Sequence, residues 1–167
     1  PWSNDVVNLL WRREIPSVQG ELDRATVQCE RKKGSGLKLP PEQLERIRSA
    51  YEELSCENIE YLRSLPRRIE TMAEGLRVVA FHGAPRGVSE TLGPEDNPDR
   101  FRRVRELTQA DIVAYGGLPE PFEYLIDGCL FVCPGTVTVE TGGSVARYAV
   151  IDTETAPWHA DFRQIEY

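Results

Sequence analysis

Residues able to do acid–base or metal chemistry stand at two glycine-rich segments of the sequence. Glu21 and Asp23 follow the glycine of SVQGELDR, and His82, one of 2 histidines in 167 residues, ends the apolar run of VVAFHG. A third segment, IVAYGGLPEP, offers only the main chain of Gly116 and Gly117. In open α/β sheets ligands bind beyond the carboxyl ends of the strands, and glycine lets a ligand approach the main chain closely. We therefore expect chemistry where these segments end.

Two interpretations of these residues remain open from type and spacing. A carboxylate and an imidazole that converge from separate strands form a minimal metal or acid–base site. Alternatively, His82 only closes a strand, while Glu21 and Asp23 fill the N-terminus of a helix, whose dipole favours negative charge. Other site motifs are missing from the sequence. KKGSGLK lacks the Gly-Lys-Ser/Thr of a phosphate-binding P-loop, no Gly-x-Ser-x-Gly elbow occurs, and the 4 cysteines form no CxxC pair.

Helical patterns fill the first half of the chain and strand patterns the second. Cap residues or prolines before apolar positions predict helices over 3–13, 21–30, 40–54, 56–65 and 98–107. Apolar runs bounded by Gly, Pro or Asp predict strands over 15–20, 67–75, 76–83, 111–117, 122–128, 129–140, 144–154 and 160–167. This order predicts a single layered α/β domain over residues 1–167.

The composition limits the classes of partner and the cellular compartment that we expect for the protein. The formal net charge of −7 disfavours a nucleic-acid or anionic-membrane surface, because phosphate is repelled on average. No apolar run reaches the ~18 residues of a membrane span, and the first residues are not those of a signal peptide. We therefore expect four reduced thiols and a cytoplasmic protein.

Taken in sequence order, the motifs resemble those of the calcineurin-like metallophosphoesterases, specifically their small bacterial phosphodiesterase-like branch. That family carries Gly-Asn-His-Asp/Glu, His-Gly-Ser-Pro, Gly-His-Thr-His and Pro-Gly-Ser-Val. Here QGELDRA, FHGAPRG, YGGLPEPF and CPGTVTV stand in their places. The resemblance implies a layered β-sandwich flanked by helices (α/β/β/α). It also implies a centre of two divalent cations (Mn, Zn or Fe) that hydrolyses phosphoric esters.

The same resemblance implies a role for individual positions. Glu21 stands for an asparagine that ligates the bridging site, Asp23 is kept as a supporting carboxylate, and His82 is an inherited metal ligand. The family's catalytic acid and two further histidine ligands are replaced by residues without a side-chain donor: Leu22, Gly117 and Pro119. The family's opening Asp-x-His and Gly-Asp segment has no counterpart. The expectation is therefore a chain that lacks the first β-α-β segment, either as a fragment or through loss in the lineage.

These replacements predict a degenerate member, a pseudoenzyme without two-metal hydrolysis and without a resident cofactor. It would hold a phosphate-bearing small molecule, or serve a regulatory role, through the main chain near Gly83 and Gly116 and the side chain of Arg86. One alternative is a metal-dependent phosphodiesterase with an altered site. Another is an assembly partner, including a homo-oligomer, that pairs through an exposed sheet edge.

Overall fold

The computed structural model describes residues 3–32, 39–85, 90–137, 145–154 and 156–166. The chain divides into two compact units, Pro1–Arg67 and Arg68–Tyr167, which we call the first and the second unit. The change from helices to strands that the sequence predicts falls at this boundary. The single domain expected over residues 1–167 stays a prediction.

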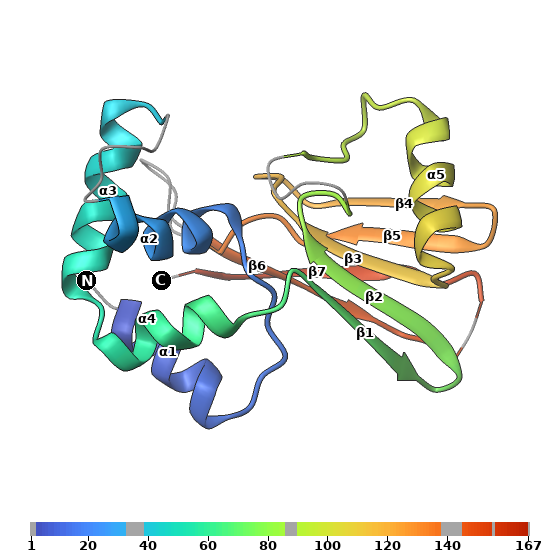
Figure 1. Ribbon diagram of the computed structural model, residues 1–167. Helices are drawn as coiled ribbons and strands as arrows, with labels where there is room; N and C mark the ends of the chain where they lie inside the picture. Colours follow the sequence, from blue (N-terminus) through green and yellow to red (C-terminus); the bar gives the residue numbers. More distant parts are fainter. Residues whose placement is uncertain (1–2, 33–38, 86–89, 138–144, 155, 167) are drawn as a thin grey trace. The chain divides into compact units, whose positions relative to one another are not determined.

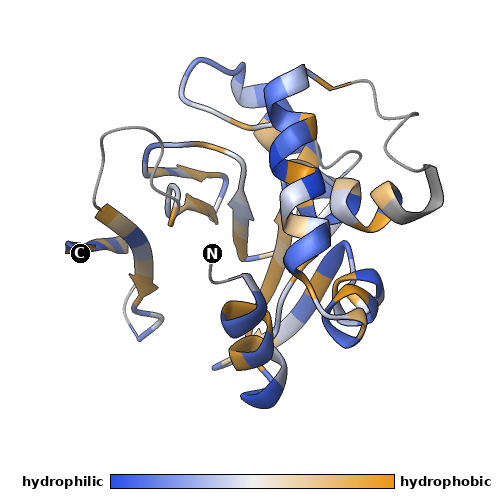
Figure 2. Ribbon diagram, turned by 90° about the vertical axis from the view of Figure 1, so that its left-hand side faces the viewer, coloured by the Kyte–Doolittle hydropathy of each residue, from blue (hydrophilic) through white to orange (hydrophobic). Residues whose placement is uncertain are grey.

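The first unit consists of four helices: α1 (Ser3–Arg12), α2 (Glu21–Lys32), α3 (Pro41–Glu53) and α4 (Cys56–Ser64). Hydrophobic and hydrophilic residues alternate along the helices, as the orange and blue ribbon of Figure 2 shows. Ser55 caps α4, because its Oγ accepts a hydrogen bond from the Asn58 amide at 3.2 Å. All four helices were predicted from their caps, prolines and apolar spacing, and all four are confirmed.

The strand predicted over 15–20 is wrong, because these residues form a loop. Pro16 has no amide hydrogen to give to a ladder. The Gln19 amide instead donates to the Pro66 carbonyl at 2.8 Å, and its side-chain amide donates to the Leu62 carbonyl at 2.8 Å. The loop is therefore fixed by contacts with the end of α4 and the residues just after it, and no strand lies within residues 3–20 before α2.

The second unit contains a mixed five-stranded sheet in the order β1-β2-β3-β5-β4. Its central strands β2, β3 and β5 run parallel, and β1 and β4 pair antiparallel at the two edges. Helix α5 (Pro98–Thr108) follows β2, and β6 pairs with β7 in a separate antiparallel ribbon. The strands are β1 (Arg68–Ala73), β2 (Leu76–His82), β3 (Ile112–Gly116), β4 (Phe122–Ile126), β5 (Cys129–Cys133), β6 (Val145–Ile151) and β7 (Ala160–Glu166).

The second unit has three layers, with the sheet between α5 and the β6–β7 ribbon (Figure 1). On one face Val79, Val113 and Phe131 pack with Phe101 and Val104 of α5. On the opposite face the alternate residues pack against the ribbon: Ile112, Leu130 and Val132 with Ala149, Trp158 and Phe162. This two-sided burial explains the near-continuous apolar runs of the central strands. The observed class is the predicted one, a mixed α/β fold with a central sheet covered on both faces.

Two turns show why these strands end where they do. Asp127 and Gly128 both take positive φ, 48° and 77°, which suits the tight hairpin between β4 and β5. The strand predicted over 129–140 stops at Cys133, because Pro134 and Gly135, with φ of 85°, turn the chain. A second hairpin signal in the sequence, Gly142-Gly143, lies outside the described residues. Among the helices described, none has both the length and the apolar character needed to cross a membrane.

Candidate functional site

The carboxyl ends of β2 and β3 meet, as the sequence predicts for the segments FHG and YGG. His82 and Gly116 are partners in the parallel register, and the Gly83 amide donates to the Gly116 carbonyl at 3.3 Å. Gly83 takes φ of 77°, which turns the chain away from the strand. We call this group of residues, His82, Gly83, Gly116 and Gly117, the strand-end corner.

The His82 ring lies directly over Gly116. A β-carbon built on Gly116 would stand 2.9 Å from His82 Nδ1 and 3.4 Å from Cε1. Real β-carbons do not approach so closely, so only glycine accommodates the ring in this position. His82 itself is half-buried, so its imidazole keeps contact with solvent. The ring is therefore placed by the main chain of the neighbouring strand.

Gly117 has no room for a side chain either. Its φ of 101° strains any other residue, and an added β-carbon would meet Thr91 Cγ2 at 3.1 Å. The residue itself is exposed, so its main chain is open to solvent. The backbone at this position thus suits close approach by a ligand and is incompatible with the histidine that the family resemblance implies.

Pro119 lies next to the Pro-Gly turn that follows β5. Its carbonyl accepts hydrogen bonds from the Thr136 amide at 3.2 Å and from Arg147 at 3.3 Å. Arg147 also pairs with Glu120 at 3.2 Å. The turns after β3 and β5 are therefore tied together.

Glu21, Leu22 and Asp23 stand in the first turn of α2, the helix predicted over 21–30, and a loop precedes them in place of the predicted strand. The Asp23 carboxylate accepts a hydrogen bond from the Gly20 amide at 2.9 Å, which satisfies a donor at the start of the helix. Leu22 is 60% exposed. Of the two interpretations that the sequence left open for Asp23, the structure shows the second: its carboxylate lies at the N-terminus of a helix. Arg86 lies outside the described residues.

Within neither unit do the described His, Cys, Asp and Glu side chains form a group of three that could hold a metal ion. In the second unit His82 contributes one imidazole to the strand-end corner, and Gly117 and Pro119 have no donor side chain. Glu21, Leu22 and Asp23, predicted around the first motif, stand together in the first turn of α2. The assigned roles of the site residues stay predictions.

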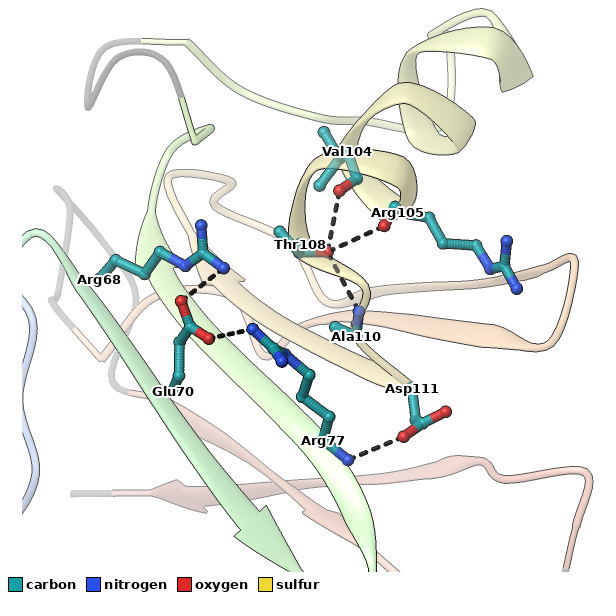
Figure 3. A network of polar contacts seen from close by, with 8 residues as sticks. All are labelled: Arg68, Glu70, Arg77, Val104, Arg105, Thr108, Ala110 and Asp111. Atoms are coloured by element: carbon teal, nitrogen blue, oxygen red, sulfur yellow. Dashed lines mark hydrogen bonds and ion pairs between the residues drawn. The ribbon is translucent and has the colours of Figure 1, made fainter.

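A charged network on β1, β2 and the start of β3 was not predicted from the sequence. Figure 3 shows the Glu70 carboxylate between Arg68, at 2.6 Å, and Arg77. Asp111 accepts from the Arg77 amide at 2.8 Å, and its own amide donates to the Arg77 carbonyl at 2.9 Å. The contacts between Arg77 and Asp111 join the starts of β2 and β3, whereas Arg68 and Glu70 lie on β1 opposite Phe81 and Val79. The network ties neighbouring strands together, and its observed role is structural.

Comparisons with known proteins identify a family model that matches the sequence and solved structures that share the fold. The sequence matches the calcineurin-like phosphoesterase superfamily domain over residues 3–156. No curated protein matches the chain significantly. A hypothetical protein from Pyrococcus horikoshii aligns with a TM-score of 0.83 at 19% identity, covering 100% of this chain and 70% of that one. A metallophosphoesterase from Sphaerobacter thermophilus aligns with a TM-score of 0.69 at 21% identity, covering 98% and 71%. At these identities the structural likeness shows the fold alone.

Proposed function

The chain belongs to the calcineurin-like phosphoesterase superfamily, and from that membership we propose that it binds a phosphate-bearing ligand at the strand-end corner without the family's two-metal hydrolysis. The observation that carries the proposal is the exposed main chain of Gly117 and the half-buried main chain of Gly116 beside the half-buried His82 imidazole. Glycine main chain and an imidazole donor are groups that bind phosphate oxygens without a metal.

The donor set does not fit the family's metal pair. Two cations about 3.5–4 Å apart need several ligands each. The corner offers one imidazole, and Gly117 and Pro119 offer no donor. In the first unit Glu21 adds a carboxylate, but the carboxylate of Asp23 already caps α2. Leu22, in the place of the family's catalytic acid, cannot transfer a proton. Binding in this proposal therefore rests on the main chain and the imidazole alone.

The contacts within the corner assign different parts to its residues. The Gly83 amide is engaged with the Gly116 carbonyl, so Gly83 contributes the turn and not a free donor. Gly116 holds the His82 ring in place, and Gly117 leaves the approach open. A phosphate oxygen above Gly117 would meet the imidazole from one side and the glycine main chain from the other.

The experiment is a titration of the full chain with inorganic phosphate, followed by amide chemical shifts and by calorimetry. We expect shifts at Gly116 and Gly117, and a loss of about tenfold or more in affinity for His82→Ala, since a hydrogen bond to a charged group is worth ~1.5–3 kcal/mol. His159→Ala is the matched control, because His159 is exposed and lies outside the strand-end corner, with its Nδ1 at 3.4 Å from Glu123. Equal affinity of the two variants would contradict the proposal.

A second candidate, a metal-dependent phosphodiesterase with an altered site, is favoured by family membership and by the retained His82. It requires stoichiometric metal and turnover of a generic aryl phosphodiester such as bis(4-nitrophenyl) phosphate. That result would replace the binding role with hydrolysis. Pairing through the open sheet edges β1 and β4, in a homo-oligomer or with another chain, stays a prediction, which light scattering of the full chain would test.

A further inference from the structure

A cavity of about 330 Å³ opens in the second unit next to the strand-end corner. Ala84 and Pro85, which line it, directly follow Gly83 in the chain. Its other walls come from the segment before α5 and from the helix itself. The volume lies within the ~300–1,000 Å³ range of small-molecule sites. The wall of the cavity therefore begins at Ala84, the residue that follows Gly83 of the strand-end corner, with consecutive Cα atoms about 3.8 Å apart.

The floor of the cavity is apolar and held in place. Leu92, Val104 and Ala84 line it and are only 1%, 7% and 8% exposed. The Leu92 carbonyl accepts a hydrogen bond from the Tyr115 hydroxyl at 3.0 Å. Burial raises the pKa of Tyr115, so this hydroxyl stays a donor at neutral pH. The floor is thus formed before any ligand arrives.

Of the two arginines that line the cavity, Arg103 forms no ion pair within the described residues. Arg100 pairs with Asp96, and Asp99 pairs with Arg102 at 2.9 Å, so both are engaged within the helix and its cap. Arg103 also lines the cavity, and no ion pair joins it to any residue of the described chain. A guanidinium is weakly hydrated and stacks on aromatic faces. An apolar floor with a free guanidinium beside it suits a planar aromatic group.

We propose that this cavity binds the aromatic group of a phosphate ester whose phosphate lies at the strand-end corner. The inference rests on the proposed function, because it places the ester's phosphate beside His82. It adds the class of ligand, an aryl or other planar aromatic ester, and it assigns ring contacts to Leu92, Val104 and Arg103. No covalent step is involved.

The test is a chemical-shift titration of the full chain with three probes: phenyl phosphate, inorganic phosphate and benzyl alcohol. Both phosphates shift the amides of Gly116 and Gly117, and only phenyl phosphate and benzyl alcohol shift those of Leu92 and Val104. At the efficiency usual for drug-sized ligands, six ring carbons make phenyl phosphate bind about twentyfold more tightly than phosphate.

Two adjacent arginines supply a matched pair of variants. Arg103→Gln weakens the binding of phenyl phosphate by about threefold and leaves the affinity for inorganic phosphate unchanged, because only the contact with the ring is lost. Arg102→Gln changes neither affinity, because Arg102 bonds to Asp99 and Asp127 and does not line the cavity. Amide spectra of both variants verify that the fold is kept.

The outcomes separate this inference from the proposal beneath it. Equal affinity for phenyl phosphate and phosphate, with shifts at Gly116 and Gly117 for both, overturns the aromatic site and leaves the phosphate site standing. With phenyl phosphate as the probe, shifts at Leu92 and Val104 without any at Gly116 and Gly117 overturn both, because the ring would then bind without its phosphate at the corner. Equal effects of the two arginine variants also overturn the inference.

Discussion

A methyl group added at Gly116 tests how the His82 ring is positioned. The added β-carbon of Gly116→Ala would lie 2.9 Å from Nδ1, so the ring must turn away from its rotamer. Such a displacement costs ~0.5–1.5 kcal/mol. Alanine in place of glycine in a strand otherwise gains ~0.5–1 kcal/mol. With His82 present the two effects nearly cancel, whereas in a His82→Ala background only the gain remains.

The prediction is therefore a coupling of about 1 kcal/mol between residues 116 and 82. It is measured by urea unfolding of the parent chain, the two single variants and the double variant, as a double-mutant cycle. Gly93→Ala is the control, because its added β-carbon meets Leu118 Cδ2 at an ordinary 3.7 Å and is expected to show no coupling to His82. A Gly116–His82 coupling within about 0.3 kcal/mol of zero would refute the packing described here.

Three further predictions concern single positions. Gly117→Ala should lower the free energy of unfolding by ~1–3 kcal/mol, because of backbone strain and the contact of the added methyl group with Thr91. The loss should exceed that of Gly128→Ala, since Gly128 has positive φ but nothing within 4 Å of an added β-carbon. Calorimetric unfolding of the two variants measures the difference. Asp23→Ala should lower the free energy of unfolding by about 1 kcal/mol, because the helix cap is lost, whereas Asp23→Asn keeps an acceptor and should lose less. A smaller loss of stability for Asp23→Ala than for Asp23→Asn in urea unfolding would contradict the role of Asp23 as a cap. Burial raises the pKa of the Cys129 thiol from 9.0 to about 12. The contribution of the neutral, buried thiol to folding stability is therefore complete below pH 9 and is lost as the pH rises toward 12. Alkaline unfolding of Cys129→Ala should show a shallower decline, and at pH 8 a thiol reagent should label exposed Cys56 well before Cys129.

The helices and strands could be predicted largely because their signals are local. Ser55 before α4 and Pro98 in the first turn of α5 mark helix starts without reference to the rest of the chain. The failure at 15–20 has a physical reason. An apolar pair beside Pro16 looks like a short strand, but a strand needs a partner, and the sequence does not reveal that the Gln19 amide bonds to Pro66.

The candidate site was predictable in part. Parallel strands bring their carboxyl ends to one edge, so the meeting of His82 with Gly116 follows from the order of elements. The part played by Asp23 at a helix cap could be stated only as one of two alternatives, because a carboxylate near a helix start also suits a ligand. The cavity beside α5 could not be predicted, because its walls depend on how the residues that follow β2 pack against the helix, which no local pattern reveals.

The most direct test of the central claim is the metal content and the phosphodiesterase activity of the full chain after incubation with manganese or zinc and removal of free ions. The account predicts well under one bound ion per chain and no turnover of bis(4-nitrophenyl) phosphate above that of buffer, together with metal-independent binding of phosphate that His82→Ala weakens. Stoichiometric metal, with turnover that a chelator abolishes, would contradict it.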